Sequence, residues 1–238
     1  MICKTYDEAM RSAENAFNVS RQDRVLLEEY IEGESYSTSV ILKYHKVICA
    51  VFGNESYYVN KYLVSGACTS VDLDNEAKTA LCADIEKISR SIGLCSGLFH
   101  TQFIVDKSGY PVIIDPCRRA PGDLYIKFAK YATGINFPEM IVKAETGGDL
   151  FAPKETPPLK YIARMCVMTD RNGIFKGVTI PETIREKIIE MMIWAKPYET
   201  IDDHMKYKAG IMFLEEKTPE KLYNLFKNFH GYVKIEFV

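Results

Sequence analysis

Two segments set far apart in this 238-residue chain most constrain its fold. The first, VLLEEYIEGESYS, covers residues 25 to 37, and the second, GLFHTQFIVDKSGYPVIIDPCRRAPGD, covers residues 97 to 123. The first pattern predicts a strand, a glycine turn at Gly33 and a second strand, and the second predicts two strands joined at Lys107-Ser108-Gly109. Because carboxylate, amide and guanidinium groups gather at the far end of the second pair, we expect a polar site there.

The composition is that of a globular protein with a packed core, since 47% of residues are hydrophobic and 26% are charged. Thirty Lys and Arg against 32 Asp and Glu give a net charge of −2, which disfavours nucleic acid and anionic membranes as partners. No apolar run reaches the roughly 18 residues that cross a bilayer, and MICKTYDEAM lacks the pattern of a secretory signal. Seven cysteines without a C-x-x-C pair indicate reduced thiols. We therefore expect a cytoplasmic protein.

Hydrophobic periodicity predicts the elements of the first part of the chain. Helices are expected where apolar residues recur at helical spacing, and one of them begins after the capping residue Asp74 and ends before Gly93. Strands are expected where β-branched and aromatic residues lie between turn formers. The predicted helices are residues 6–17, 74–92, 124–131 and 138–145, and the predicted strands are 25–31, 36–42 and 47–52; the pattern at 53–72 is ambiguous.

A domain boundary is predicted near residue 150. The segment FAPKETPPL, residues 151–159, carries three prolines and reads as a linker, so the chain divides into domains at 1–150 and 151–238. A smaller module follows, with a helix at 219–229 capped by Thr218. Its predicted strands are residues 161–168, 175–180, 188–195, 207–214 and 233–237.

Together the two segments resemble the second half of an ATP-grasp domain, the fold of biotin carboxylase, carbamoyl phosphate synthetase, D-alanine–D-alanine ligase and related carboxylate–amine ligases. The resemblance covers roughly residues 5 to 150, and the tail is more loosely similar to the small C-terminal domain that some of these ligases carry. It implies an α+β fold, an antiparallel sheet with backing helices that lacks the N-terminal half of the ATP-grasp domain, followed by a smaller α+β C-terminal subdomain.

The first segment carries the expected adenine contacts. A strand that ends at a glycine turn leaves backbone groups without ladder partners, and these can bond to a purine edge. By resemblance, Glu29 and Ile31 do so beside Tyr30, with Glu28 near the purine amine. Ile104 would form the apolar floor under the adenine. The alternative is an exposed acidic hairpin with no ligand.

One carboxylate of the first segment is displaced from its usual place. Family members often hold the ribose hydroxyls with a Glu two positions after the glycine, whereas Glu34 follows Gly33 directly. Because strand side chains alternate between faces, this shift would turn Glu34 away from the ligand unless the turn absorbs it.

The second segment carries the expected metal and phosphate contacts, where the resemblance implies Mg²⁺ between protein oxygens and ATP phosphates. Gln102 stands where the first carboxylate belongs and brings no negative charge. Asp115 keeps the second carboxylate, and Cys117 replaces an asparagine with a soft sulfur that suits Mg²⁺ poorly. Arg119 fits its phosphate-binding position unaltered. His100 lies on the same strand face as Gln102 and could approach the phosphates, or it is a packed structural residue.

A plainer interpretation of the same residues is a solvated turn in which Asp115 forms a salt bridge with an arginine. Tyr57, Tyr58 and Lys61 could face the substrate, or form an exposed strand edge.

The resemblance implies an enzyme that phosphorylates a small carboxylate substrate with ATP and lets an amine attack the acylphosphate. The lysine strand and the glycine-rich loop of the first ATP-grasp half are not found before Glu28, so we expect this polypeptide alone to be a poor catalyst. The chain could be part of a longer ligase with a further N-terminal segment, a homodimer, or a short relative with a degenerate metal site. A non-catalytic module that binds nucleotide or a protein partner, and a purely structural domain, remain rivals.

Overall fold

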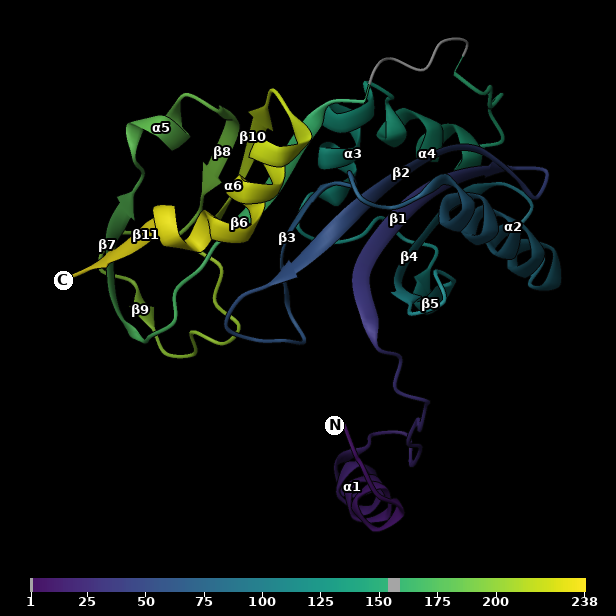
Figure 1. Ribbon diagram of the computed structural model, residues 1–238, viewed down its shortest axis with the longest axis horizontal. Helices are drawn as coiled ribbons and strands as arrows, with labels where there is room; N and C mark the ends of the chain where they lie inside the picture. The colour runs from purple at the N-terminus through teal and green to yellow at the C-terminus, as the bar shows by residue number, and fades with distance from the viewer. Residues whose placement is uncertain (1, 154–158) are drawn as a thin grey trace.

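The computed structural model describes residues 2–153 and 159–238 (Figure 1). It is a mixed α+β fold built on a large antiparallel sheet with helices on both faces. Within the described residues, no helix is long and apolar enough to span a membrane.

Eight strands form the large sheet in the order β5-β4-β1-β2-β3-β6-β10-β8, and every neighbouring pair is antiparallel. The central strand β1 is buried on both faces from Tyr36 to Leu42, with Val40 and Leu42 in the core under α2 and Ile41 in the core on the opposite face. The strands are β1 Gly33–Lys43, β2 Lys46–Tyr57, β3 Val64–Thr69, β4 Gly97–Asp106, β5 Pro111–Cys117, β6 Tyr161–Val167, β8 Ile188–Ile193 and β10 Gly210–Glu216.

Helices cover the two faces unequally. On one face, α2 (Asn75–Ser91) packs over β1 and β4, and α6 (Pro219–Tyr232) packs over β6 and β10. On the other face, α3 (Tyr125–Thr133) and α4 (Phe137–Glu145) pack against β1, β2, β6 and β10. We call this second face the α3 face. The helices cover it at the end of β1 and the beginning of β4, where Ile41 and Leu98 are buried. The polar residues described below lie further along the same strands.

A smaller sheet completes the C-terminal part, with the order β11-β7-β9. Its strands are β7 Gly173–Thr179, β9 Thr200–Ile201 and β11 Lys234–Phe237, with the short helix α5 Glu182–Arg185 after β7. β9 and α5 were not predicted from the sequence. The large sheet contains strands from both sides of residue 150, joined where β3 pairs with β6, so the division into 1–150 and 151–238 stays a prediction. Part of the predicted linker, residues 154–158, lies outside the described residues.

The predicted helix signals are confirmed where they rest on caps. Asp74 Oδ1 accepts a hydrogen bond from the Ala77 N–H at 2.6 Å and begins α2. Thr218 caps α6 in the same way, by accepting from Lys221 N at 3.3 Å. The remaining predicted helices and most strands lie within a few residues of their observed bounds, and β2 extends through the ambiguous segment to Tyr57.

The predicted strand at residues 25–31 is wrong. Residues 24–32 have no regular secondary structure, and all side chains from Arg21 to Tyr30 are exposed. Gly33 is not a hairpin turn either, because it begins β1 and pairs with Asp106 of β4. A strand pattern needs a neighbouring strand to complete its hydrogen bonds, and no strand of the described residues pairs with this segment.

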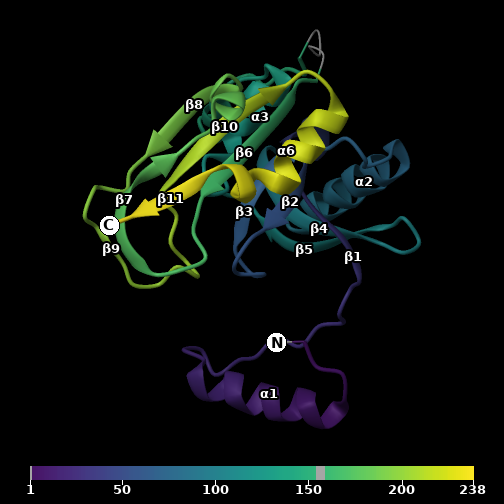
Figure 2. The ribbon, with the colours of Figure 1, turned by 60° about the vertical axis from the view of Figure 1, so that its left-hand side comes forward.

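The N-terminal helix α1 (Tyr6–Val19) stands apart from the rest of the structure (Figures 1 and 2). None of its residues is buried, although Met10 and Phe17 give it an apolar side. The segment that joins it to β1 runs out from the end of the sheet at which β1 begins.

Candidate functional site

Register brings the polar residues of the second segment together on the α3 face. Gln102 of β4 pairs with Asp115 of β5, and His100 pairs with Cys117. Residues two apart share a face of a strand, so these four side chains lie on one side of the sheet. Arg119 follows immediately after the end of β5. The structure thus brings together all five predicted metal and phosphate residues.

These five side chains line a cavity of about 160 Å³, which we call the β4–β5 cavity. The other residues that line it are Glu55 of β2, Val64 of β3, Arg164 of β6 and, at and just before the start of α3, Pro121, Gly122, Asp123 and Tyr125. This volume is smaller than the roughly 300–1,000 Å³ of pockets that enclose whole small-molecule ligands. The cavity could therefore take a phosphate end and a cation, with the rest of a nucleotide lying outside it.

Glu55 also lines the cavity, although it lies on β2 and not in the second segment, where the sequence predicted the metal ligands. Its Oε2 accepts hydrogen bonds from Gln102 Nε2 at 2.7 Å and from the Tyr57 hydroxyl at 2.8 Å. Burial raises the pKa of the Glu55 carboxyl, while hydrogen bonds from Tyr57, Gln102 and Ser37 and the nearby Arg164 guanidinium act in the opposite direction. Gln102, which stands where the family resemblance implies a carboxylate, is thus hydrogen-bonded to the carboxyl group of Glu55.

Arg164 is the largest fully buried side chain among the described residues and is only 2% exposed. Its Nη1 donates to the backbone oxygen of Asp123 at 2.9 Å and lies 3.5 Å from the Asp123 carboxylate, which Lys208 also contacts. Its Nε has no hydrogen-bond partner among the described residues. Because an unpaired buried donor is costly, and more so when charged, a buried guanidinium nitrogen at a cavity wall is suited to an anionic ligand.

His100 is neutral in this environment. Burial, together with the positive charges of Arg119 and Arg164, lowers its pKa to about 4. Its Nδ1 lies 2.9 Å from the Ser39 hydroxyl, which fixes the ring. A neutral imidazole can donate one hydrogen bond to a phosphate but cannot supply a charge near pH 7.

The arginines of the second segment have separate environments. Arg118 Nη2 donates to both Glu145 oxygens at 2.8 Å, outside the cavity lining. Arg119 is exposed, and its Nη1 donates to the Ala120 carbonyl at 3.1 Å. The Cys117 thiol donates weakly to the Arg119 carbonyl at 3.7 Å. Asp115 forms no ion pair within residues 2–153 and 159–238, so the predicted alternative of an Asp115–arginine salt bridge is not seen.

The expected adenine residues do not line this cavity. Glu28, Glu29 and Tyr30 are exposed in the irregular segment before β1, and Ile31 is partly buried. Ile104 is partly buried on β4, two residues beyond Gln102 on the same face. It lies next to the beginning of β1, which is where the irregular segment joins the sheet.

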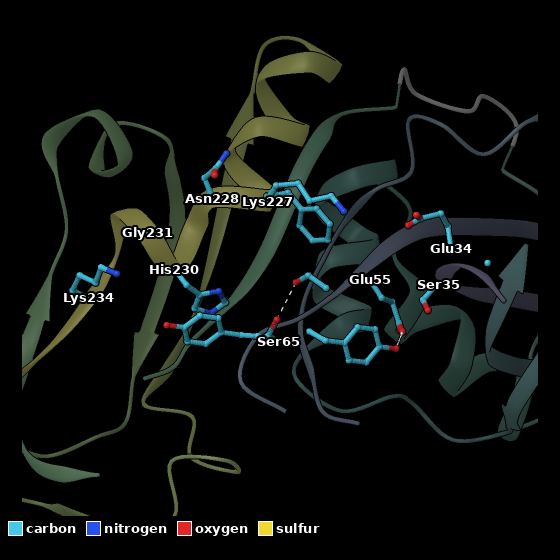
Figure 3. A pocket seen from close by; sticks show the side chains of 14 residues that line it. Glu34, Ser35, Glu55, Ser65, Lys227, Asn228, His230, Gly231 and Lys234 are labelled. Carbon is cyan, nitrogen blue, oxygen red and sulfur yellow. Dashed lines mark hydrogen bonds between the residues drawn. The ribbon is translucent and has the colours of Figure 1, made fainter. Parts of the chain in front are cut away.

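Glu34 lies on the other face of the sheet, as the alternation of strand side chains requires. It pairs with Val105, whereas Ser35 pairs with Ile104. It lines a second, more open cavity of about 550 Å³ between the beginning of β1, the end of β2 and α6, which we call the α6 cavity (Figure 3). Glu55 contributes to both cavities.

Aromatic stacking closes one side of the α6 cavity. The Tyr58 and His230 rings lie parallel, with centroids 4.0 Å apart. Burial lowers the pKa of His230 to about 4, and the nearby Lys234 acts in the same direction. The Ser56 and Ser65 hydroxyls, 3.0 Å apart, also line this cavity. Tyr58 thus packs against α6.

Sequence reasoning missed Glu55 and Arg164. Each lies on a strand whose distance in sequence from the second segment hides the contact, and neither belongs to a motif with a fixed spacing. The sequence offered one indication: because Gln102 lacks the carboxylate that the family resemblance implies, another carboxylate could be expected near it.

The donor set suits Mg²⁺ held jointly with a ligand. The described residues contain no group of three or more His, Cys, Asp or Glu side chains placed to hold a metal ion. However, Mg²⁺ usually binds through one or two carboxylates, several waters and substrate phosphates. Asp115, the Gln102 amide oxygen and Glu55 fit that pattern, whereas Cys117 does not.

Comparison with known proteins identifies the family. Residues 2–123, just over half of the chain, match the ATP-grasp domain model. No curated protein sequence matches the chain.

Solved structures share the fold at low sequence identity. L-amino acid ligase from Bacillus licheniformis superposes with a TM-score of 0.81 at 15% identity, over 99% of this chain and 60% of that one. Phosphoribosylglycinamide synthetase from Anaerococcus prevotii gives 0.76 at 16% identity, over 99% and 61%. The biotin carboxylase domain of Hydrogenobacter thermophilus 2-oxoglutarate carboxylase, in complex with MgADP and bicarbonate, gives 0.75 at 16% identity, over 99% and 54%. The chain thus spans about three fifths or less of the length of these proteins.

Proposed function

Because this chain belongs to the ATP-grasp domain family, we propose that it is the C-terminal portion of an ATP-grasp ligase, which binds Mg·ATP and, in the full-length enzyme, couples a carboxylate to an amine. The proposal agrees with the structural neighbours, which include an L-amino acid ligase and a carboxylase domain in complex with MgADP and bicarbonate. It also agrees with the chain spanning only part of those proteins.

One observation carries the proposal. The β4–β5 cavity gathers Gln102, Asp115 and Arg119 from the second segment around the buried Arg164, whose Nε has no partner in the described part of the chain. The carboxyl groups of Asp115 and Glu55 and the Gln102 amide oxygen, with two guanidinium groups in the same lining, suit a cation held by an anionic ligand.

The proposed roles follow from these positions. Asp115 and the Gln102 amide oxygen would contact Mg²⁺, with Cys117 at the edge of the metal site, and Arg119 and His100 would contact phosphate oxygens. Arg164 would pair with the substrate carboxylate or the transferred phosphoryl group. For the nucleoside, we propose Glu28, Glu29, Tyr30 and Ile31 at the adenine edge, Ile104 beneath the ring, and Glu34 toward the ribose, which would require the chain at Gly33 to turn.

In the proposed reaction, a carboxylate oxygen attacks the γ-phosphorus of ATP, and the bond to the bridging oxygen breaks to release ADP. The amine then attacks the acylphosphate carbon, inorganic phosphate leaves, and the nitrogen loses a proton. Bound Mg²⁺ would neutralise phosphate charge during the first transfer. This chain's guanidinium groups would hold the charge on the non-bridging oxygens and orient the substrate.

The rival function is a non-catalytic module that binds nucleotide or a protein partner. Gln102 and Cys117 favour it, because Gln102 lacks the negative charge, and Cys117 the hard oxygen, that the family resemblance implies. The two functions differ in whether Mg²⁺ contributes to nucleotide binding.

Titration calorimetry of ATP into this polypeptide, with and without Mg²⁺, tests the proposal. We expect Mg²⁺ to strengthen ATP binding, and we expect Asp115→Ala to weaken binding in the presence of Mg²⁺ by about tenfold or more, because it removes a charged ligand. Glu215→Gln, a change at a partly exposed residue of β10 that does not line the β4–β5 cavity, is the matched control. ATP binding that depends on neither Mg²⁺ nor Asp115 would favour the non-catalytic module. The absence of ATP binding would contradict the proposed ligase portion and leave, of the rival, only a module that binds a protein partner.

A further inference from the structure

We infer that Glu55 supplies the carboxylate that Gln102 lacks, so that this chain would hold the cation of its nucleotide with one carboxylate from β2 and one from β5. The inference rests on the proposed function and deepens it. It assigns a metal-binding role to a residue that lies outside the two sequence segments and on the far side of β1 from the other candidate ligands.

The sheet explains how the two side chains reach each other. Gly53 of β2 pairs with Ser37 of β1, and Ser37 pairs in turn with Gln102 of β4. Glu55, two residues after Gly53 on β2, shares its face. Because the side chain that lies between them on β1 is a small serine, Gln102 Nε2 can reach Glu55 Oε2 at 2.7 Å.

This hydrogen bond sets the orientation of both groups. Gln102 uses its amide nitrogen on Glu55, so its acceptor oxygen is left for the Asp115 side of the cavity. The bonds from Gln102 and Tyr57 both end on Glu55 Oε2, and the Ser37 hydroxyl also bonds to this carboxyl group. Glu55, Gln102 and Asp115 thus place three oxygen-bearing side chains across the sheet, with a carboxyl group at each end.

Arg164 provides an independent indication that a ligand binds here. Its side chain is 2% exposed, it lines the same cavity, and its Nε lacks a partner in the structure as described. Arg119 adds a second positive charge. Because two guanidinium groups oppose a free cation, we expect the cation to bind together with a polyanion that satisfies the arginines.

A purely structural interpretation is that Glu55 only anchors Gln102. Under that interpretation, replacing Glu55 by glutamine would leave cation binding unchanged, because glutamine keeps an oxygen that can accept from Gln102. Under our inference it is the charge of Glu55 that matters, and a charge at position 102 would substitute for it.

A charge-exchange experiment separates the two interpretations. The probe is Mn²⁺ in the presence of saturating ATP, followed by electron paramagnetic resonance of the free ion and by calorimetry. The proteins are the parent, Glu55→Gln, Gln102→Glu and the exchanged double variant Glu55→Gln/Gln102→Glu. Glu215→Gln is again the control, and thermal unfolding verifies that each variant is folded.

We expect Glu55→Gln to weaken Mn²⁺ binding by at least about tenfold through loss of a charged ligand. We expect the exchanged variant to recover affinity to within about threefold of the parent, since the carboxylate and the amide have traded places across the same hydrogen bond. Full affinity in Glu55→Gln, or an exchanged variant no better than Glu55→Gln, would overturn the inference.

The outcomes also distinguish this inference from the proposed function. If Asp115→Ala loses cation-dependent ATP binding while Glu55→Gln retains it, the proposed function stands and the role of Glu55 falls. If the parent protein binds no Mg·ATP or Mn·ATP at all, both fall together.

Discussion

At the scale of single residues, His230 couples the packing of α6 to pH. Its ring stacks on Tyr58, and its Nε2 lies 3.1 Å from the Cys166 carbonyl oxygen, as expected for a donated hydrogen bond. Burial lowers its pKa from 6.5 to about 4. Between these values the unfolded chain binds a proton that the folded chain does not, so stability should fall as the pH drops from about 6.5 towards 4.

We expect His230→Gln, which keeps a donor for Cys166, to remove about 2 kcal/mol of the stability difference between pH 7 and pH 5. The measurement is urea unfolding of parent and variant at both pH values. The matched control is His204→Gln, at a partly exposed histidine outside α6, which should retain the pH dependence of the parent. If the free energy of unfolding changed equally with pH in the parent and in the His230 variant, the lowered pKa of His230 would not be the cause of the pH dependence.

The candidate site could be predicted from the sequence only in part. Gln102, Asp115 and Cys117 lie together because strand alternation and one short turn determine their positions, and both are visible in a single segment. Glu55 and Arg164 depend on register across several strands, which is set by tertiary packing. No local pattern of residues encodes that register.

At the scale of elements, caps predicted helix ends well, and α2 shows why. Its first turn leaves N–H groups without partners, and the Asp74 carboxylate accepts one of them at 2.6 Å. We expect Asp74→Ala to lower the free energy of unfolding by about 1 kcal/mol. Chemical denaturation measures the change. Lys87→Ala, at an exposed position of the same helix, should change stability little, and an equal loss in both variants would contradict the capping role.

Strands were predicted less reliably than helices because a strand depends on its neighbours. Residues 25–31 have the composition of a strand, yet they are irregular and largely exposed. In contrast, β1 forms because β2 and β4 pair with both of its edges. The two-residue β9 was missed because it is too short to show a period.

At the scale of the whole molecule, the sheet unites parts of the chain that composition separates. The prolines after residue 150 suggested a boundary, but β6, β8 and β10 extend the large sheet beyond it. On the face that α6 covers, Cys68 of β3 accordingly packs in one core with Ala163 of β6 and Leu214 of β10. Removing the C-terminal part would therefore expose an edge of the central sheet.

In contrast to the C-terminal part, the N-terminal segment contributes almost nothing to the core. No residue of α1 is buried, and residues 21–30 are all exposed. Deleting residues 2–31 removes almost no buried apolar area, so we expect the melting temperature to stay within about 2 °C of the parent value. The measurement is thermal unfolding followed by circular dichroism.

Deleting residues 234–238 is the matched control for this truncation. It removes β11, which pairs with β7 and buries Ile235, and should lower the melting temperature by about 5 °C or more. If deletion of residues 2–31 destabilised the protein as much, α1 would have to pack against the sheet in solution. If it left stability intact but weakened ATP binding, the segment from Glu28 to Ile31 would act in nucleotide recognition without supporting the fold, which separates the adenine contacts from the core that carries Asp115.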